Sequence, residues 1–205
     1  MNRIPLRHRI RALSAAGGLL VLAGCAAGAG TPVTDAAATL SPAYDPASVW
    51  RAARDGLPTV VHGNPFALPR EQAERLVLST LRMPGWHRPA GFVAAPDAGE
   101  RRGYRLVVVF NPARPVGHGG ACRDLREIAL GPSAATTRLH AAFCASERPL
   151  SHISGRAALT GPDDPAFRRL LAQALEQLLP RRNHLIEDDD LPRRRWIGAF
   201  RLAPS

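Results

Sequence analysis

Two His-Cys pairs with the same spacing are the first candidates for chemistry in this chain of 205 residues. His118 precedes Cys122 by four residues, and His140 precedes Cys144 by four residues. Two imidazoles and two thiolates form a ligand set that zinc accepts. Residues four apart share one face of a helix, but on a strand they lie about 13 Å apart. Because we expect residues 136–145 to form a strand, the spacing argues against chelation of one ion, and we predict neither a metal site nor a cofactor.

The third cysteine, Cys25, ends a stretch that is organised like a bacterial secretory signal. Four arginines precede an apolar segment, residues 12–23, and its 12 residues are fewer than the roughly 20 that a membrane-spanning helix needs. The segment ends in Leu22-Ala23-Gly24-Cys25, which resembles the lipobox of bacterial lipoproteins. That resemblance implies that residues 1–24 are a signal peptide and that Cys25 becomes the lipidated first residue. The alternative is a secreted protein without an anchor.

The lipoprotein resemblance also implies a place in the cell envelope. More than one acyl chain anchors a protein stably to a membrane. Ala26 follows the cysteine, where aspartate would be the usual signal for retention at the inner membrane. We therefore expect an outer-membrane lipoprotein that faces the periplasm, with the inner membrane as the alternative. The rest of the chain resembles uncharacterised proteobacterial lipoproteins, and that resemblance implies no activity.

The net charge narrows the expected partners. Arginine supplies all 27 basic residues, against 17 acidic ones, and the formal net charge is +10. Four arginines lie in residues 1–24, so the mature chain carries +6, which is basic but not extreme. A protein anchored in the envelope meets anionic lipid headgroups, lipopolysaccharide and peptidoglycan first. Nucleic acid is therefore not an expected partner.

Cys122 and Cys144 are expected to form a disulfide, because the periplasm is oxidising. Gly131-Pro132-Ser133 lies midway between them, and we interpret residues 121–130 and 136–145 as a hairpin around this turn. Opposite residues of a hairpin have Cβ atoms about 4.5–5.5 Å apart, which is close to disulfide range. A turn longer or shorter by one residue would break this register, so free thiols remain an alternative.

Three other polar motifs could form a catalytic or binding site, but each also has a simpler structural interpretation. Ser151 and His152 are adjacent, and neighbours in an extended chain point apart, so we expect a polar turn rather than a nucleophile with its base. The acidic run 187–190 lacks the spacing of a calcium loop and is flanked by arginines, which favours a charged tail. Asn64 and Asn111 each follow an extended run and precede proline. If those strands are parallel neighbours, the two turns could rim one ligand pocket, although Asn-Pro is also ordinary turn chemistry.

The elements that position these residues follow from hydrophobic periodicity and from turn residues. We expect a flexible tether over 25–44, a domain over 45–182 and a charged C-terminal tail over 183–205. Within the domain, helices are predicted at 45–55, 69–82 and 164–179, strands at 59–62 and 104–110, and a polar loop at 84–103. This order predicts an α+β fold, a small and mostly antiparallel sheet with amphipathic helices packed on one face.

These observations favour a non-catalytic adaptor or structural protein, held to the outer membrane through Cys25 and bound to a protein partner in the envelope. The alternative is a periplasmic binding module for a small ligand, a lipid or a glycan. An envelope hydrolase or metal enzyme is the third hypothesis, and neither a Gly-x-Ser-x-Gly nor a Ser-x-x-Lys motif supports it.

Overall fold

The computed structural model describes residues 33–34, 38–95 and 103–186. The predicted signal peptide, Cys25 and the acidic run 187–190 lie outside the described residues. Within the described ranges, no helix is long and apolar enough to cross a membrane.

The helices are α1 (Pro46–Ala52), α2 (Arg70–Thr80), α3 (Gly120–Arg123) and α4 (Pro165–Leu178), with a 3₁₀ turn at Leu125–Glu127. The strands are β1 (Val33–Thr34), β2 (Thr39–Leu40), β3 (Leu57–His62), β4 (Phe92–Ala94), β5 (Tyr104–Phe110), β6 (Thr136–Ala145) and β7 (Arg148–Ala158). Aspartates cap α1 and α4, because the side chains of Asp45 and Asp164 accept hydrogen bonds from Ala47 N and Ala166 N.

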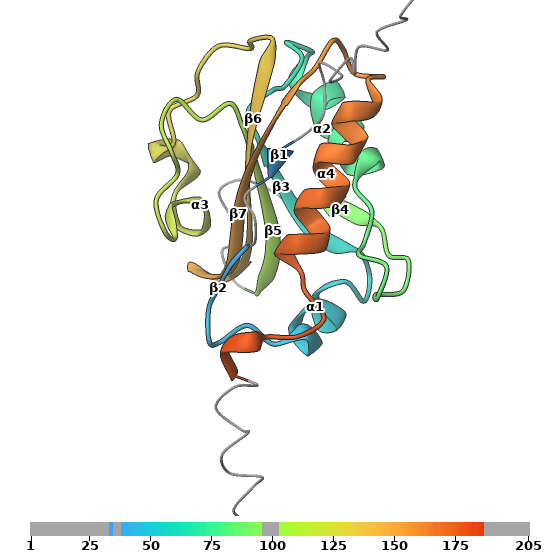
Figure 1. The fold of residues 1–205 in the computed structure, drawn as a ribbon, viewed down its shortest axis with the longest axis vertical. Helices are drawn as coiled ribbons and strands as arrows, with labels where there is room; N and C mark the ends of the chain where they lie inside the picture. The colour runs from blue at the N-terminus through green and yellow to red at the C-terminus, as the bar shows by residue number, and fades with distance from the viewer. Residues whose placement is uncertain (1–32, 35–37, 96–102, 187–205) are drawn as a thin grey trace, which may run out of the picture.

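One sheet organises the described chain, in the order β1-β7-β6-β5-β3-β4, with β2 also paired to β7. The pairs of β7 with β1, β2 and β6, and of β6 with β5, are antiparallel, whereas β3 pairs in parallel with β4 and β5. Figure 1 shows α1, α2 and α4 on one side of this sheet and α3 on the other. The predicted α+β fold is therefore confirmed. The edge strand β4 was missed, since it lies inside the predicted polar loop.

The main core fills the space between the sheet and α1, α2 and α4. The apolar stripe of α4 faces the sheet, with Phe167, Leu170 and Leu171 buried, and Phe110 contributes from the centre of the sheet. Burying a large apolar side chain stabilises a fold by about 1.5–3 kcal/mol. This stripe therefore holds α4 on the sheet, as its sequence periodicity predicts.

The opposite face of the sheet carries a smaller apolar cluster under α3 and the 3₁₀ turn. Val107 and Val109 of β5 pack there with Ala142 of β6 and with Cys122 and Cys144. β5 is therefore covered by an apolar cluster on each of its two faces. This explains why its sequence is a continuous apolar run.

The N-terminal segment departs from the expected tether. β1 pairs with Gly155 and Arg156 of β7, and β2 pairs with Ser151 and His152. The edge of β7 offers unpaired backbone groups, and a short extended segment satisfies them without any side-chain pattern of its own. The sequence therefore contained no signal for these two strands.

The hairpin prediction was wrong. The hairpin is formed by β6 and β7, which turn at Ser146 and Glu147, and residues 120–127 form α3 and the 3₁₀ turn instead of a strand. Ser146 adopts a left-handed conformation (φ 55°) that a turn residue such as Gly or Asn adopts more readily. Because the true turn lacks those residues, the glycine and proline at 131–132 were misread as the turn.

Candidate functional site

Cys122 and Cys144 form a disulfide, with their Cα atoms 5.6 Å apart. The predicted pair is confirmed, but the geometry differs from the prediction, because the bond joins helix α3 to strand β6 rather than two strands of a hairpin. Arg105 on β5 supports the same junction, since its guanidinium donates to Cys122 O (2.6 Å) and to Ser146 O (2.8 Å). The link therefore fastens the α3 layer to the sheet.

The disulfide rules out the zinc set of two histidines and two thiolates, because both sulfurs are bonded to each other. The histidines of that set do lie close together. The ring centroid of His152 is 5.3 Å from that of His118 and 5.8 Å from that of His140. Among the described residues, no group of three or more His, Cys, Asp or Glu side chains is placed to hold a metal ion.

Ser151 and His152 point to opposite faces of the sheet, as expected for neighbours in an extended chain. Ser151 Oγ donates to Leu178 O (2.6 Å) under α4, whereas the His152 ring lies with the other two histidines on the α3 side. The predicted polar turn at this position was wrong, because both residues lie within β7. The pair has no shared geometry for nucleophile activation.

Asn64 follows β3, and Asn111 follows β5. These two strands are parallel neighbours, as a ligand pocket shared by the two turns would require. Their side chains nevertheless build the turns. Asn64 donates to Leu68 O and accepts from Phe66 N (3.0 Å), while Asn111 Oδ1 accepts from Arg138 N (2.9 Å). Asn64 lines a small pocket beside β3 that Asn111 does not line. Their proposed ligand role stays a prediction.

A basic pocket of about 400 Å³ lies on the α3 side of the sheet, where β6, β7 and the loop after β5 meet. Three arginines line it, Arg114 from the loop, Arg138 from β6 and Arg156 from β7. His140 and Ser154 also line it and lie within hydrogen-bond distance of each other, Nδ1 to Oγ 3.2 Å. The pocket could not be predicted from the sequence, because Arg138 and Arg156 come together only through the pairing of β6 with β7, and Arg114 joins them from a loop.

An aromatic cluster that is partly exposed lies at α1, and we call Trp50, Trp86, His87 and Arg88 together the α1 surface. Trp50 is 38% exposed and stacks on His87, with ring centroids 4.0 Å apart. Trp86 meets both rings edge-on, and the Arg88 guanidinium lies 5.7 Å from the Trp50 ring centroid. Trp86 Nε1 donates to Leu179 O (2.8 Å), which holds this cluster against the end of α4.

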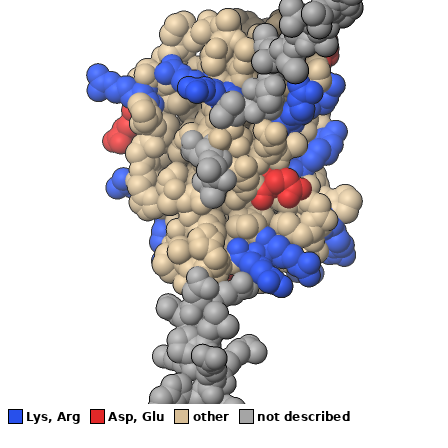
Figure 2. All heavy atoms as spheres, viewed as in Figure 1, with Lys and Arg blue, Asp and Glu red and all other residues tan. Residues whose placement is uncertain are grey.

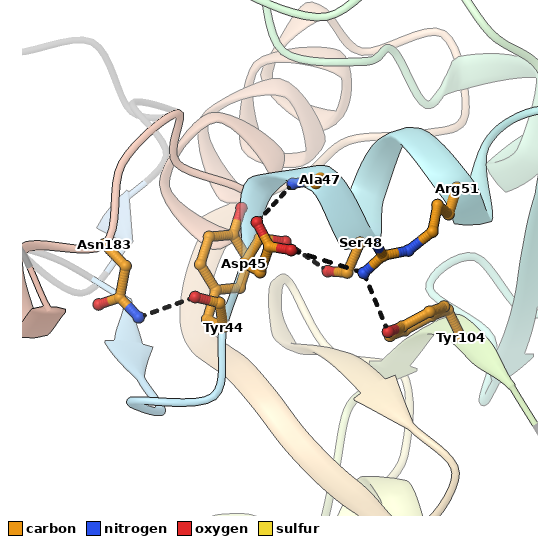
Figure 3. A network of polar contacts seen from close by, with 7 residues as sticks. All are labelled: Tyr44, Asp45, Ala47, Ser48, Arg51, Tyr104 and Asn183. Atoms are coloured by element: carbon orange, nitrogen blue, oxygen red, sulfur yellow. Dashed lines mark hydrogen bonds and ion pairs between the residues drawn. The ribbon is translucent and has the colours of Figure 1, made fainter.

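Polar contacts fix α1 against the two ends of the described domain (Figure 3). Asn183 Nδ2 donates to Ser41 O and Tyr44 O, both at 2.9 Å, and Tyr44 OH donates to Pro180 O (2.8 Å). Burial, and secondarily the charge of Asp45, raises the pKa of the Tyr44 hydroxyl, so it stays a donor. Asn183 is buried and belongs to the folded domain, although residues from 183 on were expected to form a tail.

The far side of α1 is tied to the sheet by Arg51. Its guanidinium pairs with the Asp45 carboxylate at 3.5 Å and donates to the Tyr104 hydroxyl at 3.4 Å. Both Arg51 and Asp45 are more than half exposed, so the pair adds little stability and mainly restrains the arginine.

No model of a known protein family matches the chain, and no curated protein matches it. Among solved structures, the chain is similar to PelC from Paraburkholderia phytofirmans, which was solved as a dodecamer. The likeness covers 74% of this chain and 100% of that one, at 16% identity and a TM-score of 0.38. A likeness this distant carries no argument about function, which must therefore be argued from the chain's own residues.

Proposed function

We propose that this protein is a lipid-anchored periplasmic adaptor of the outer membrane, with a non-catalytic role, and that its α1 surface binds a protein partner of the envelope. The observation that carries the proposal is the cluster of Trp50, Trp86, His87 and Arg88, in which Trp50 and Arg88 are exposed, Trp86 is half-buried and His87 is buried beneath them. The lipobox at Cys25 supports the anchor, and the disulfide supports an oxidising compartment.

The α1 surface has the composition of a protein interface. Tryptophan and arginine dominate the residues that contribute most to binding between proteins, and lysine is depleted there. Arg88 is exposed and lies over the Trp50 ring, and Arg54, four residues after Trp50, is also exposed. Figure 2 shows basic side chains at the end of the molecule where α1 lies in Figure 1, and further ones at the opposite end. A partner with acidic groups around an apolar centre would complement this surface.

The cluster is also rigid before any partner binds. Trp86 is hydrogen-bonded to the end of α4, and Gly85 N donates to the Glu176 carboxylate (2.8 Å). A preorganised surface loses less conformational entropy on association than a disordered one. A partner that covers Trp50 would therefore bury the part of its side chain that is still exposed at little further cost in ordering.

β1 and the α1 surface lie toward opposite ends of the sheet. β1 begins eight residues after Cys25 and pairs with Arg156 of β7. Arg156 in turn lies opposite Arg138, near the start of β6. Tyr104, which contacts α1 through Arg51, is opposite Ala145 at the end of β6. Seven residues of strand separate Arg138 from Ala145, which is about 23 Å. The α1 surface is thus separated along the sheet from the point where the described chain begins.

Site-specific photo-crosslinking in cells tests the proposal. A photoreactive residue at Arg54, beside Trp50, should give one discrete crosslinked product with an envelope protein. The same residue at Arg168, which is exposed on α4, is the matched control and should give none. Adding Trp50→Ala to the Arg54 probe should remove the product while the circular dichroism spectrum stays unchanged.

The anchor is tested in the same cells with Cys25→Ala. Loss of lipidation should release the protein from the outer-membrane fraction and reduce the crosslink, because the partner is met at the membrane. Equal products from positions 54 and 168, or a product that survives Trp50→Ala, would contradict the adaptor role of the α1 surface. Unchanged fractionation of Cys25→Ala would contradict the anchor.

A further inference from the structure

We infer that the pocket lined by Arg114, Arg138 and Arg156 is a binding site for a phosphate-bearing anion. It is separate from the α1 surface and lies toward the opposite end of the sheet. Its lining combines three arginines with His140 and Ser154, and none of the described residues that line it is acidic.

The pairing of the arginines is unfavourable without a bound anion. Arg138 of β6 and Arg156 of β7 are direct cross-strand partners, and their side chains share the face of the sheet that bears the pocket. Like charges in this position destabilise a sheet. Among the described residues, no Asp or Glu forms an ion pair with either arginine. A ligand with negative charge would remove this repulsion, so the pocket is built to favour one.

The chemistry of the lining favours phosphate among anions. Guanidinium groups present donors in a planar fork that matches phosphate oxygens, and several can bind one phosphate together. The Ser154 hydroxyl and the His140 ring, which are within hydrogen-bond distance of each other, also line the pocket and make it polar. A volume of about 400 Å³ leaves room for the group that carries the phosphate, such as a sugar or a glycerol.

The position of the pocket suggests where such a ligand is met. Thr34 of β1 lines the pocket, and Cys25 precedes β1 by eight residues, which span at most about 29 Å when extended. An anchor at Cys25 would hold the pocket close to the phosphates of lipid headgroups. This placement rests on the proposed anchor, whereas the anion site itself does not.

Calorimetric titration of the full-length protein in a neutral detergent tests the site. The probes are inorganic phosphate, dihexanoyl phosphatidylglycerol for an anionic headgroup, and dihexanoyl phosphatidylcholine for a zwitterionic one. We expect one saturable site per chain for the first two and none for the third. Tighter binding of phosphatidylglycerol than of phosphate identifies the headgroup as the source, and the reverse order identifies a free phosphate-bearing ligand.

Variants connect the binding to the pocket. Arg138→Gln and Arg156→Gln should each weaken binding by about 10- to 100-fold, the loss expected for a charge-assisted hydrogen bond. Arg168→Gln and Arg169→Gln remove the same charge from the exposed side of α4 and should leave binding unchanged. Without an anion, Arg156→Gln should also raise the melting temperature, since it relieves the cross-strand repulsion. Arg114→Gln, on the loop, gives the same test without altering a strand.

Two results would overturn the inference. One is the absence of saturable binding of both phosphate and phosphatidylglycerol to the native chain. The other is equal weakening by the pocket variants and the α4 variants, which would indicate a general effect of net charge. Because the titration needs neither lipidation nor a partner, it can fail while the crosslinking succeeds, and the reverse also holds.

Discussion

Replacing Cys122 and Cys144 together by alanine removes the covalent link between α3 and β6. The two residues are separated by 22 positions, and closing a loop of that length stabilises a fold by about 3 kcal/mol in the chain-entropy model. For a domain of this size, each kcal/mol changes the melting temperature by about 2–4 °C. We therefore expect the melting temperature to fall by about 6–12 °C. Alanine is chosen because both sites are fully buried, where a serine hydroxyl would need a partner.

Thermal and urea denaturation of the native chain and the double variant measure this effect. The native chain under a reducing agent is the matched control and should lose stability by a similar amount. Amide hydrogen exchange then locates the effect. Protection should fall at α3 and the 3₁₀ turn, because the small cluster around Val107 and Val109 is their main apolar attachment, while α4 should keep its protection.

The reasoning would be refuted by a loss of less than about 1 kcal/mol with unchanged exchange at α3. That result would mean that the hydrogen bonds from Arg105 to Cys122 O and Ser146 O hold the α3 layer without the disulfide. A uniform loss of protection from amide exchange across the whole domain would also contradict the prediction, because the disulfide is expected to act mainly on α3 and its neighbours.

Two further substitutions test single features of the fold. Gly63→Ala should lower the free energy of unfolding by more than about 1 kcal/mol in a urea titration, because Gly63 has φ 85° and an added Cβ would overlap Phe110 O. Gly161→Ala is the control, since a Cβ there meets open space, and it should change the free energy of unfolding by less than about 0.5 kcal/mol. Hydrogen bonds from Thr160 and Ala166 hold the pKa of the Asp164 carboxyl below its usual 3.8, so its charge stabilises the fold above pH 3.8 and this contribution is lost as the pH falls below that value. Asp164→Asn should therefore have a lower melting temperature than the native chain at pH 6, and the gap should shrink toward pH 2.5; a gap that stays constant would show that the charge has no part in the cap.

Local chemistry explains which elements could be predicted. α4 has an aspartate cap, a proline at its first turn and a continuous apolar stripe, so its own residues specify where it begins and which face it buries. β5 is an apolar run ended by Asn111 and Pro112, and its predicted bounds match the structure. In both cases the information lies within one segment of the chain.

The candidate sites depended on pairing between segments. The turn at Ser146 and Glu147 lacks the usual turn residues, so the register of β6 with β7 could not be read from the sequence. That register alone places Arg138 opposite Arg156. The α1 surface likewise joins Trp50 to Trp86 and His87 across more than thirty residues of chain.

The sequence by itself determined α1, α2 and α4, the α+β class, and the choice of Cys122 and Cys144 as a pair. Caps and hydrophobic periodicity act locally, and the small number of cysteines leaves few possible pairs. The tertiary structure decided that the disulfide joins a helix to a strand, that Ser151 and His152 face opposite sides of β7, and that three arginines line one pocket. These outcomes follow from strand register, and shifting a strand by one residue turns every side chain to the other face. Only the folded chain specifies that register, because it depends on the packing of all its strands together.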